Sequence, residues 1–366
     1  MKHLNQFITE YIIKKKLDKP IDSEDHYEYF PKTKKELINN IKELFDKGET
    51  DLNCIDTSDI TDMSQLFDTL KIRKKIDISN WNVRNVKDMT DMFNGFTYFN
   101  CDLSKWNVSS VKYMTRMFYL CKNFEGKGLE KWNISKVKNM SDMFNGCINF
   151  EGKCVEKWDV SKVENMICMF SNCKNFNCDL SNWDVHNVEN MAGIFNNCEN
   201  FNCDLSGWDV SKVKDMNGMF CKCNKFDYKY IENWNVSNVT NMENMFVNCT
   251  NLNCDFSNWD VHNVENMAGI FNNCKNFEGK GLEKWNVSNV YNMNSMFANC
   301  ENFDCDLSGW DVSNVEYITC AFYDCVKFKG KGLDKWIPKF VNTKEMFTNC
   351  KSMKTKPEWY EKWFKE

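Results

Sequence analysis

The chain has 366 residues, of which 42% are hydrophobic and 27% are charged, and its formal net charge is −5. A charge this mild predicts no polyanionic partner, so we expect no binding of nucleic acid. The mean hydropathy of −0.59 and the lack of any long apolar run predict no transmembrane segment. The stretch from Met1 to Lys16 has neither the apolar core nor the small-residue cleavage site of a signal peptide.

Two amphipathic helices are predicted near the N-terminus. The first runs from Leu4 to Leu17. The second follows a run of capping-box form, Thr33 to Glu36, and ends near Gly48. Its apolar face comprises Leu37, Ile38, Ile41, Leu44 and Phe45. Because the repeats that follow would leave an open end, we expect residues 1–50 to cap it. Docking to a membrane surface or a partner is the alternative for residues 1–17.

Residues 51–350 repeat at a fixed period. The run from Ser181 to Phe201 returns 76 residues later, from Ser257 to Phe277, with one substitution. A tryptophan marks the unit every 25 or 26 residues, at positions 81, 106, 132, 158, 183, 208, 234, 259, 285, 310 and 336. A phenylalanine follows 12 residues after each tryptophan from 81 to 310. Such a period is typical of a solenoid, and we expect about 11–12 coils.

Within one coil, Met267, Ile270, Phe271 and Cys274 have the i, i+3, i+4, i+7 spacing of a helix face. This predicts a two-turn helix in each coil. Its N-cap would be the preceding Asn or Asp, namely Asp88, Asn139, Asn165, Asn190, Asp215, Asn241, Asn266 and Asn292. The run from Asp255 to Val261 predicts a short strand. The expected fold is therefore an α/β solenoid with a parallel sheet along one side and helices along the other.

A second apolar residue, usually Phe, comes six positions after each residue of the phenylalanine column, as in Phe93 to Phe99. We call the segment from this residue to the next tryptophan the leg of the coil, and its length varies between 7 and 8 residues. A solenoid tolerates such variation only in a loop, so the leg is predicted to be a turn. Three legs contain Gly-Lys-Gly, at residues 126–128, 279–281 and 330–332. We interpret these glycines as turn residues with positive φ, with a phosphate-binding loop as the alternative.

Ten of the twenty cysteines lie three residues after the phenylalanine column, at positions 121, 147, 173, 198, 223, 249, 274, 300, 325 and 350. We interpret them as buried free thiols in a cytoplasmic or particle-associated protein. Disulfides between adjacent coils are the alternative, because in-register residues come within bridging range. Cys221 and Cys223, with Cys198 and Cys249, are a weaker candidate for a four-thiolate zinc site.

An Asn or Asp follows most tryptophans, at positions 82, 107, 133, 159, 184, 209, 235, 260, 286 and 311. Amide and carboxylate alternate freely there, which predicts a shared acceptor role in closing a turn. A calcium ladder is the alternative, disfavoured because half of the column is Asn. His186 and His262 occupy a place that Ser holds in other coils, so we expect them to fill a turn rather than bind a metal.

Residues 351–366 are predicted to form a C-terminal capping helix. Trp359, Tyr360, Trp363 and Phe364 would share one face of it and seal the last coil. The alternative function of that face is an aromatic patch for a partner.

The unit W-D-V-S-x-V-x-x-M-x-x-M-F-x-x-C-x-x-F is clearest in residues 107–124, 183–201, 208–226 and 286–303. It resembles the BspA-like leucine-rich repeat family, specifically its Mycoplasma-type repeat of about 25 residues. The resemblance implies a leucine-rich-repeat-like solenoid. Members of that family are commonly described as bacterial surface proteins with a role in adhesion, which implies a cell-surface location. The resemblance supplies no catalytic residue, metal or cofactor.

No catalytic constellation has a coherent place in the repeat, so we expect no enzyme activity, no metal and no cofactor. The sequence favours a binding protein that presents an extended surface to a protein or glycan, as an adhesin or host-interaction protein. The alternative is an intracellular scaffold, inhibitor or virion-associated structural protein. The sequence names neither the partner nor the face that binds it.

Overall fold

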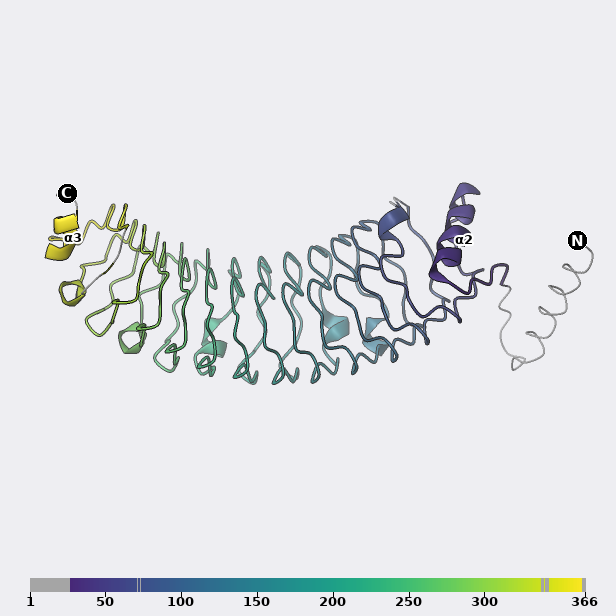
Figure 1. Cartoon of the computed structure of the whole chain (residues 1–366), viewed down its shortest axis with the longest axis horizontal. Coiled ribbons are helices and arrows are strands. Elements are labelled where there is room, and N and C mark those ends of the chain that lie inside the picture. Colours follow the sequence, from purple (N-terminus) through teal and green to yellow (C-terminus); the bar gives the residue numbers. More distant parts are fainter. Residues whose placement is uncertain (1–26, 71, 73, 337–338, 340–341, 364–366) are drawn as a thin grey trace, which may run out of the picture.

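A computed structural model of the chain describes residues 27–70, 72, 74–336, 339 and 342–363. The chain forms a single curved solenoid, with the helix α2 at one end of the arc and the helix α3 at the other (Figure 1). The helix predicted from Leu4 to Leu17 lies outside the described residues, as do Ile337, Pro338 and Phe364.

The predicted second helix is present as α2, Lys34–Asp46. The hydroxyl of Thr33 accepts a hydrogen bond from the backbone N–H of Glu36, as a capping residue should. The Glu36 carboxylate in turn accepts from the N–H of Lys32 at 2.6 Å, one residue earlier than an ordinary capping box requires. Gly48 follows with a φ of 85°, and Leu37, Ile41 and Leu44 are buried against the solenoid.

Apart from the bridges Tyr29–Ile55 and Asp51–Asp77 near the N-terminal end, the parallel pairing between coils follows a single column of residues. Isolated bridges join Asn241 to Asn266 and Asn266 to Asn292, and the same ladder runs from Asp62 to Asn342. The strand predicted from Asp255 to Val261 is wrong, because that run forms turns and irregular backbone. From Asp88 onward the sheet is thus reduced to one bridge between each pair of coils. The bridges form at the positions where the sequence predicted helix N-caps.

The two-turn helix predicted in each coil is also wrong. Gly269 and Asn273 have φ values of 60° and 62°, and equivalent left-handed residues recur in the other coils. An α-helix needs an unbroken run of right-handed residues, so two left-handed residues four apart prevent it. The N–H of Ile270 instead bonds to Met267 within the coil, whereas the N–H of Gly269 bonds to Asn294 of the next coil. Successive turns of this kind reproduce helical spacing of the buried side chains without a helix.

Stacked aromatic rings fill the interior. Neighbouring rings of the phenylalanine column lie 5.4–6.1 Å apart between centroids, whereas stacked neighbours of the tryptophan column lie 6.3–6.5 Å apart. The bridge ladder has a strand spacing of about 4.8 Å. Because the spacing widens from the ladder to the tryptophans, the rod bends with the ladder on its concave side (Figure 1).

The variable legs are turns, as predicted, and their length decides the form of the turn. Every 8-residue leg contains a short 3₁₀ helix: η2 (Leu129–Lys131), η3 (Lys153–Val155), η4 (Tyr228–Ile231), η5 (Leu282–Lys284) and η6 (Leu333–Lys335). These lie along the convex side of the arc, whereas η1 (Asp68–Leu70) lies on the concave side (Figure 1). The extra residue is therefore absorbed where the coils are furthest apart.

The C-terminal helix predicted for residues 351–366 is present as α3, Glu358–Trp363, and begins later than predicted, because residues 351–357 form turns and irregular backbone. Trp359 stacks on Trp336 with ring centroids 6.3 Å apart, and its indole N–H donates to the carbonyl of Leu333 at 2.7 Å. Tyr360 is buried against Phe347. Trp359 thus extends the tryptophan column by one step beyond the last coil.

Candidate functional site

The Asn or Asp after each tryptophan closes a turn, as the sequence predicted. In all ten coils its side-chain oxygen accepts a hydrogen bond from the backbone N–H two residues later, as in Asp209 to Ser211 at 3.0 Å and Asn107 to Ser109 at 3.1 Å. The same contact is made by Asn82, Asn133, Asp159, Asp184, Asn235, Asp260, Asn286 and Asp311. The contact uses only the side-chain oxygen, which Asn and Asp both have. Either residue can therefore occupy this position.

The two histidines fill the turn position that serine holds elsewhere. Nδ1 of His186 lies 2.6 Å from a carboxylate oxygen of Asp184, and Nδ1 of His262 lies 2.8 Å from Asp260. In an equivalent coil the Ser161 hydroxyl donates to the Asp159 carboxylate at 2.6 Å. Both imidazole rings therefore support a local turn, as predicted.

All twenty cysteines are thiols in this structure. The ten column thiols each donate to the carbonyl of a phenylalanine in the preceding coil, as in Cys249 to Phe220 at 3.0 Å. A disulfide has no such proton to donate. The repeated hydrogen bond therefore supports free thiols in this column.

Burial raises the pKa of the Cys249 thiol from 9.0 to about 12. Between these values the unfolded thiol loses its proton while the folded one keeps it, so stability falls as pH rises, by up to about 1.4 kcal/mol per pH unit for each thiol. Cys249→Ser retains a donor for Phe220 but does not titrate there. We expect this variant to lose less unfolding free energy than wild type between pH 9 and 10.5, measured by urea denaturation.

The partly exposed Cys320 provides the comparison, because Cys320→Ser should change the alkaline slope less. Equal slopes for wild type and Cys249→Ser would mean that the column thiol already ionises in the folded protein.

The weaker candidates from the sequence are not assembled into sites. The thiols of Cys198, Cys223 and Cys249 each donate to a phenylalanine carbonyl, whereas Cys221 lies on a partly exposed turn. In the described ranges, no group of three or more His, Cys, Asp or Glu side chains is placed to hold a metal ion. The Gly-Lys-Gly glycines have φ values of 77–94°, which confirms their interpretation as turn residues.

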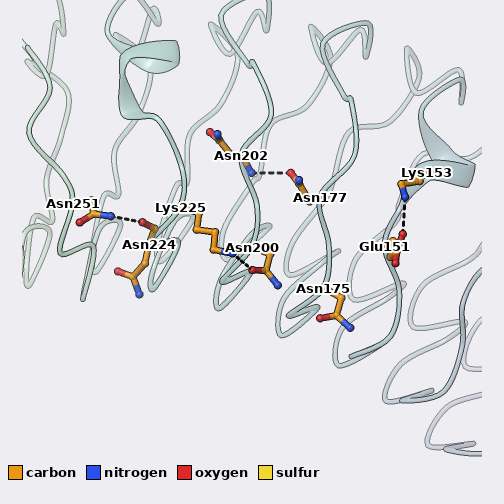
Figure 2. A pocket seen from close by; sticks show the side chains of 9 residues that line it. All are labelled: Glu151, Lys153, Asn175, Asn177, Asn200, Asn202, Asn224, Lys225 and Asn251. Atoms are coloured by element: carbon orange, nitrogen blue, oxygen red, sulfur yellow. Dashed lines mark hydrogen bonds and ion pairs between the residues drawn. The ribbon is translucent and has the colours of Figure 1, made fainter.

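A shallow polar groove crosses five coils and is the candidate binding site (Figure 2). It has a volume of about 830 Å³. Nine residues line it: Glu151, Lys153, Asn175, Asn177, Asn200, Asn202, Asn224, Lys225 and Asn251. Six of the nine are asparagines, so the lining is polar and nearly neutral.

The pattern of leg lengths explains where the groove lies. Two consecutive 7-residue legs, which start at Phe176 and Phe201, lie between 8-residue legs that contain η3 and η4. The short legs turn Cys178 and Cys203 inward, where they are 6% and 5% exposed. In Figure 2 the two short legs lie between the helical ribbons of η3 and η4, and the groove continues past η4 to Asn251.

Two asparagines of the groove, Asn177 and Asn202, are held with their NH₂ groups free, whereas the NH₂ groups of Asn200 and Asn251 donate to the carbonyls of Lys174 and Asn224. Oδ1 of Asn177 accepts from the backbone N–H of Asn202 at 3.0 Å, and Oδ1 of Asn202 accepts from Asp227 at 2.9 Å. A backbone N–H only donates, so these contacts fix which way each amide points. Within the described part of the chain, the NH₂ groups of Asn177 and Asn202 and the whole amide of Asn175 make no hydrogen bond.

The two lysines of the groove are engaged locally. Lys153 pairs with Glu151 at 2.8 Å, and Lys225 donates to the Asn200 amide at 2.7 Å (Figure 2). The net field in the groove is therefore weak. Its chemistry favours a ligand rich in hydrogen-bond acceptors and low in charge.

The sequence reasoning did not find this groove, although it identified the legs that form it. The available signal was the order of leg lengths, since among the legs from Phe99 to Trp336 only those at Phe176 and Phe201 form a consecutive short pair. The left-handed turn residues also left a signal. Asn precedes the column cysteine in six coils, at positions 172, 197, 248, 273, 299 and 349, and Asn tolerates that conformation better than most residues.

In the described ranges, neither α2 nor α3 has the length and apolarity to span a bilayer. No curated protein matches the chain. Among solved structures, the crystal structure of a TLR13–ssRNA13 complex matches with 10% sequence identity and a TM-score of 0.28. The match covers 88% of this chain and 51% of that one, so the chain spans about half the length of its match.

A family profile described as "Mycoplasma protein of unknown function, DUF285" matches the chain in four overlapping segments, residues 38–154, 121–228, 203–281 and 248–363. The tandem matches follow the repeated coils and bear out the resemblance to a Mycoplasma-type repeat. Together they reach from the helix α2 to the helix α3. The chain therefore belongs to the DUF285 family of Mycoplasma proteins of unknown function.

Proposed function

We propose that the protein is a non-enzymatic interaction protein that binds a protein or glycan partner along its repeat surface. The groove across the two short legs carries this proposal, because it presents amide donors from successive coils. Hydroxyl and ring oxygens of a glycan, or carbonyls of an extended peptide, match such donors. An adhesin or host-interaction role follows only from the resemblance to BspA-like repeats.

Asn175→Arg tests the proposal, since this amide makes no hydrogen bond within the described chain and its replacement fills the groove. The matched control is Asn276→Arg, which changes the same exposed column one coil beyond the groove. Full-length chain is applied to a glycan array and to a random peptide library. We expect ligands that bind wild type and the control but not Asn175→Arg. No ligand at all, or equal binding by both variants, would contradict the proposal.

The second candidate is an intracellular scaffold, inhibitor or virion-associated protein. The hydrogen-bonded thiol column favours it, because that arrangement needs reduced cysteines. Thiols are counted on protein from its native source, folded and then denatured, without reductant. About twenty thiols after denaturation, of which the fifteen buried ones do not react in the folded protein, support this candidate. A count near zero in both states would point to an extracellular adhesin with linked coils.

A further inference from the structure

The coil that begins at Trp106 differs from the other coils in its exposed side chains. Its segment from Tyr113 to Leu120 places Tyr113, Arg116, Tyr119 and Leu120 where the coil at Trp183 has Asn190, Gly193, Asn196 and Asn197. Tyr113 is 55% exposed and Leu120 is 38% exposed. We call these four residues, with Lys87 and Lys112, the Tyr113 patch.

Backbone conformation sets this coil apart as well. Arg116 and Leu120 have φ values of 56° and 57°. In the other coils that have two left-handed residues at these positions, at least one is Gly, Asn or Asp, among the residues that the structure describes. A left-handed arginine and an exposed left-handed leucine both oppose stability, and such strain is common where side chains serve a function.

The patch lies on the concave ladder and is cationic. The N–H of Lys112 donates to the carbonyl of Lys87 at 2.9 Å, so the two lysines occupy adjacent rungs. Neither makes an ion pair within the described part of the chain. From Arg84 to Lys138 the sequence has ten Lys and Arg against five Asp and Glu, whereas the whole chain has a net charge of −5. The patch contributes three of these cations, Lys87, Lys112 and Arg116, which lie beside the carboxylates of Asp88 and Asp91.

Arg116 is held in place but keeps free donors. Its guanidinium lies 4.6 Å from the ring centroid of Tyr119, and its Nε lies 3.4 Å from a carboxylate oxygen of Asp91. The arginine side chain is 40% exposed, and its terminal nitrogens make no hydrogen bond with the described residues. Backbone bonds from Arg116 to Ser141 and from Leu120 to Asn145 fix the patch before any ligand arrives.

We propose that the Tyr113 patch is a docking surface for an acidic segment of a partner protein. Arg116 and Lys112 receive carboxylates, and Leu120 with Tyr119 receives an apolar side chain of the same segment. Aromatic residues and arginine are the side chains enriched where protein interfaces gain most of their affinity. This site is separate from the asparagine groove and stands without it.

The arrangement of charges on the Tyr113 patch favours an acidic protein segment over a nucleic acid. Asp88, Asp91 and Asp142 lie on the same or adjacent rungs as the cations. The evenly spaced phosphates of a nucleic acid would be repelled by these carboxylates. A peptide can place its few carboxylates next to the cations alone. The exposed Leu120 also offers nothing to a phosphate chain.

A random peptide library displayed on phage and selected on the full-length chain tests the proposal. We expect the selected peptides to be rich in Asp and Glu and to contain an aliphatic or aromatic residue. Lys87→Glu/Lys112→Glu should weaken their binding by about tenfold or more. Leu120→Asn should also weaken binding while leaving the melting temperature unchanged or higher, since six other coils carry Asn there.

The control is Lys212→Glu/Lys214→Glu, which makes the same change in charge on a distant coil and should bind as wild type. Selection of no peptides, of peptides without acidic residues, or of peptides that bind the Lys87→Glu/Lys112→Glu variant equally would overturn the proposal. Peptides lost only on Asn175→Arg would leave the groove function standing and remove this one. A 20-nucleotide oligouridylate that binds wild type but not the charge variant would assign the patch to RNA instead.

Discussion

Trp208→Ala is expected to destabilise the protein by about 3–5 kcal/mol, the usual cost of removing a large buried aromatic side chain. Trp208 is 4% exposed and stacks between Trp183 and Trp234, with ring centroids 6.5 and 6.4 Å away. Its indole N–H also donates to the carbonyl of Leu180 at 3.0 Å. The substitution therefore opens a cavity in the middle of a continuous stack. Urea denaturation followed by far-ultraviolet circular dichroism measures the change.

Trp208→Phe is the matched control, because it keeps an aromatic ring in the stack and loses the indole donor. The Leu180 carbonyl still accepts from the backbone N–H of Trp183, so this variant should lose only about 1–2 kcal/mol. An unchanged denaturation curve for Trp208→Ala would mean that the tryptophan column is not in the core.

Gly281→Ala is expected to be comparably severe, at about 3 kcal/mol or more. Gly281 has a φ of 89°, and a Cβ there would lie 2.2 Å from the backbone nitrogen of Ser257. The adjacent coils are drawn together at this point by the hydrogen bond from the N–H of Phe256 to the carbonyl of Lys280. The clash is with backbone, so no side-chain rotation relieves it.

Gly95→Ala separates the clash from the cost of the left-handed conformation. Gly95 has a φ of 72°, but nothing lies within 4 Å of the Cβ that alanine would add. We expect this control to lose only about 1 kcal/mol in the same urea titration. Equal losses for the two variants would show that backbone strain alone accounts for Gly281.

Local patterns allowed much of each coil to be predicted. Apolar residues at fixed spacing identified the buried columns, because burial depends on residue type and period. The Asn or Asp after tryptophan identified a turn, since its acceptor reaches the N–H two residues later. The order of these columns could be predicted without knowledge of neighbouring coils. The same holds for the prediction that the leg of variable length is a turn.

The conformation between Asn266 and Cys274 did need that knowledge. In isolation the spacing of Met267, Ile270 and Phe271 fits a helix, where every N–H bonds within the segment. In the stack, alternate N–H groups bond to the next coil instead, as Gly269 does to Asn294. The chain accepts two left-handed residues per coil because the inter-coil bonds compensate for them.

The sequence by itself thus determined the repeat, its core columns, its Asx turns and the helix that follows Thr33. The tertiary structure alone decided the curvature, because bending depends on the difference in spacing between the ladder and the tryptophan column. It also decided the places of the groove and the Tyr113 patch. Both surfaces form only when side chains or legs of several coils lie side by side, and that is a property of stacking rather than of any single coil.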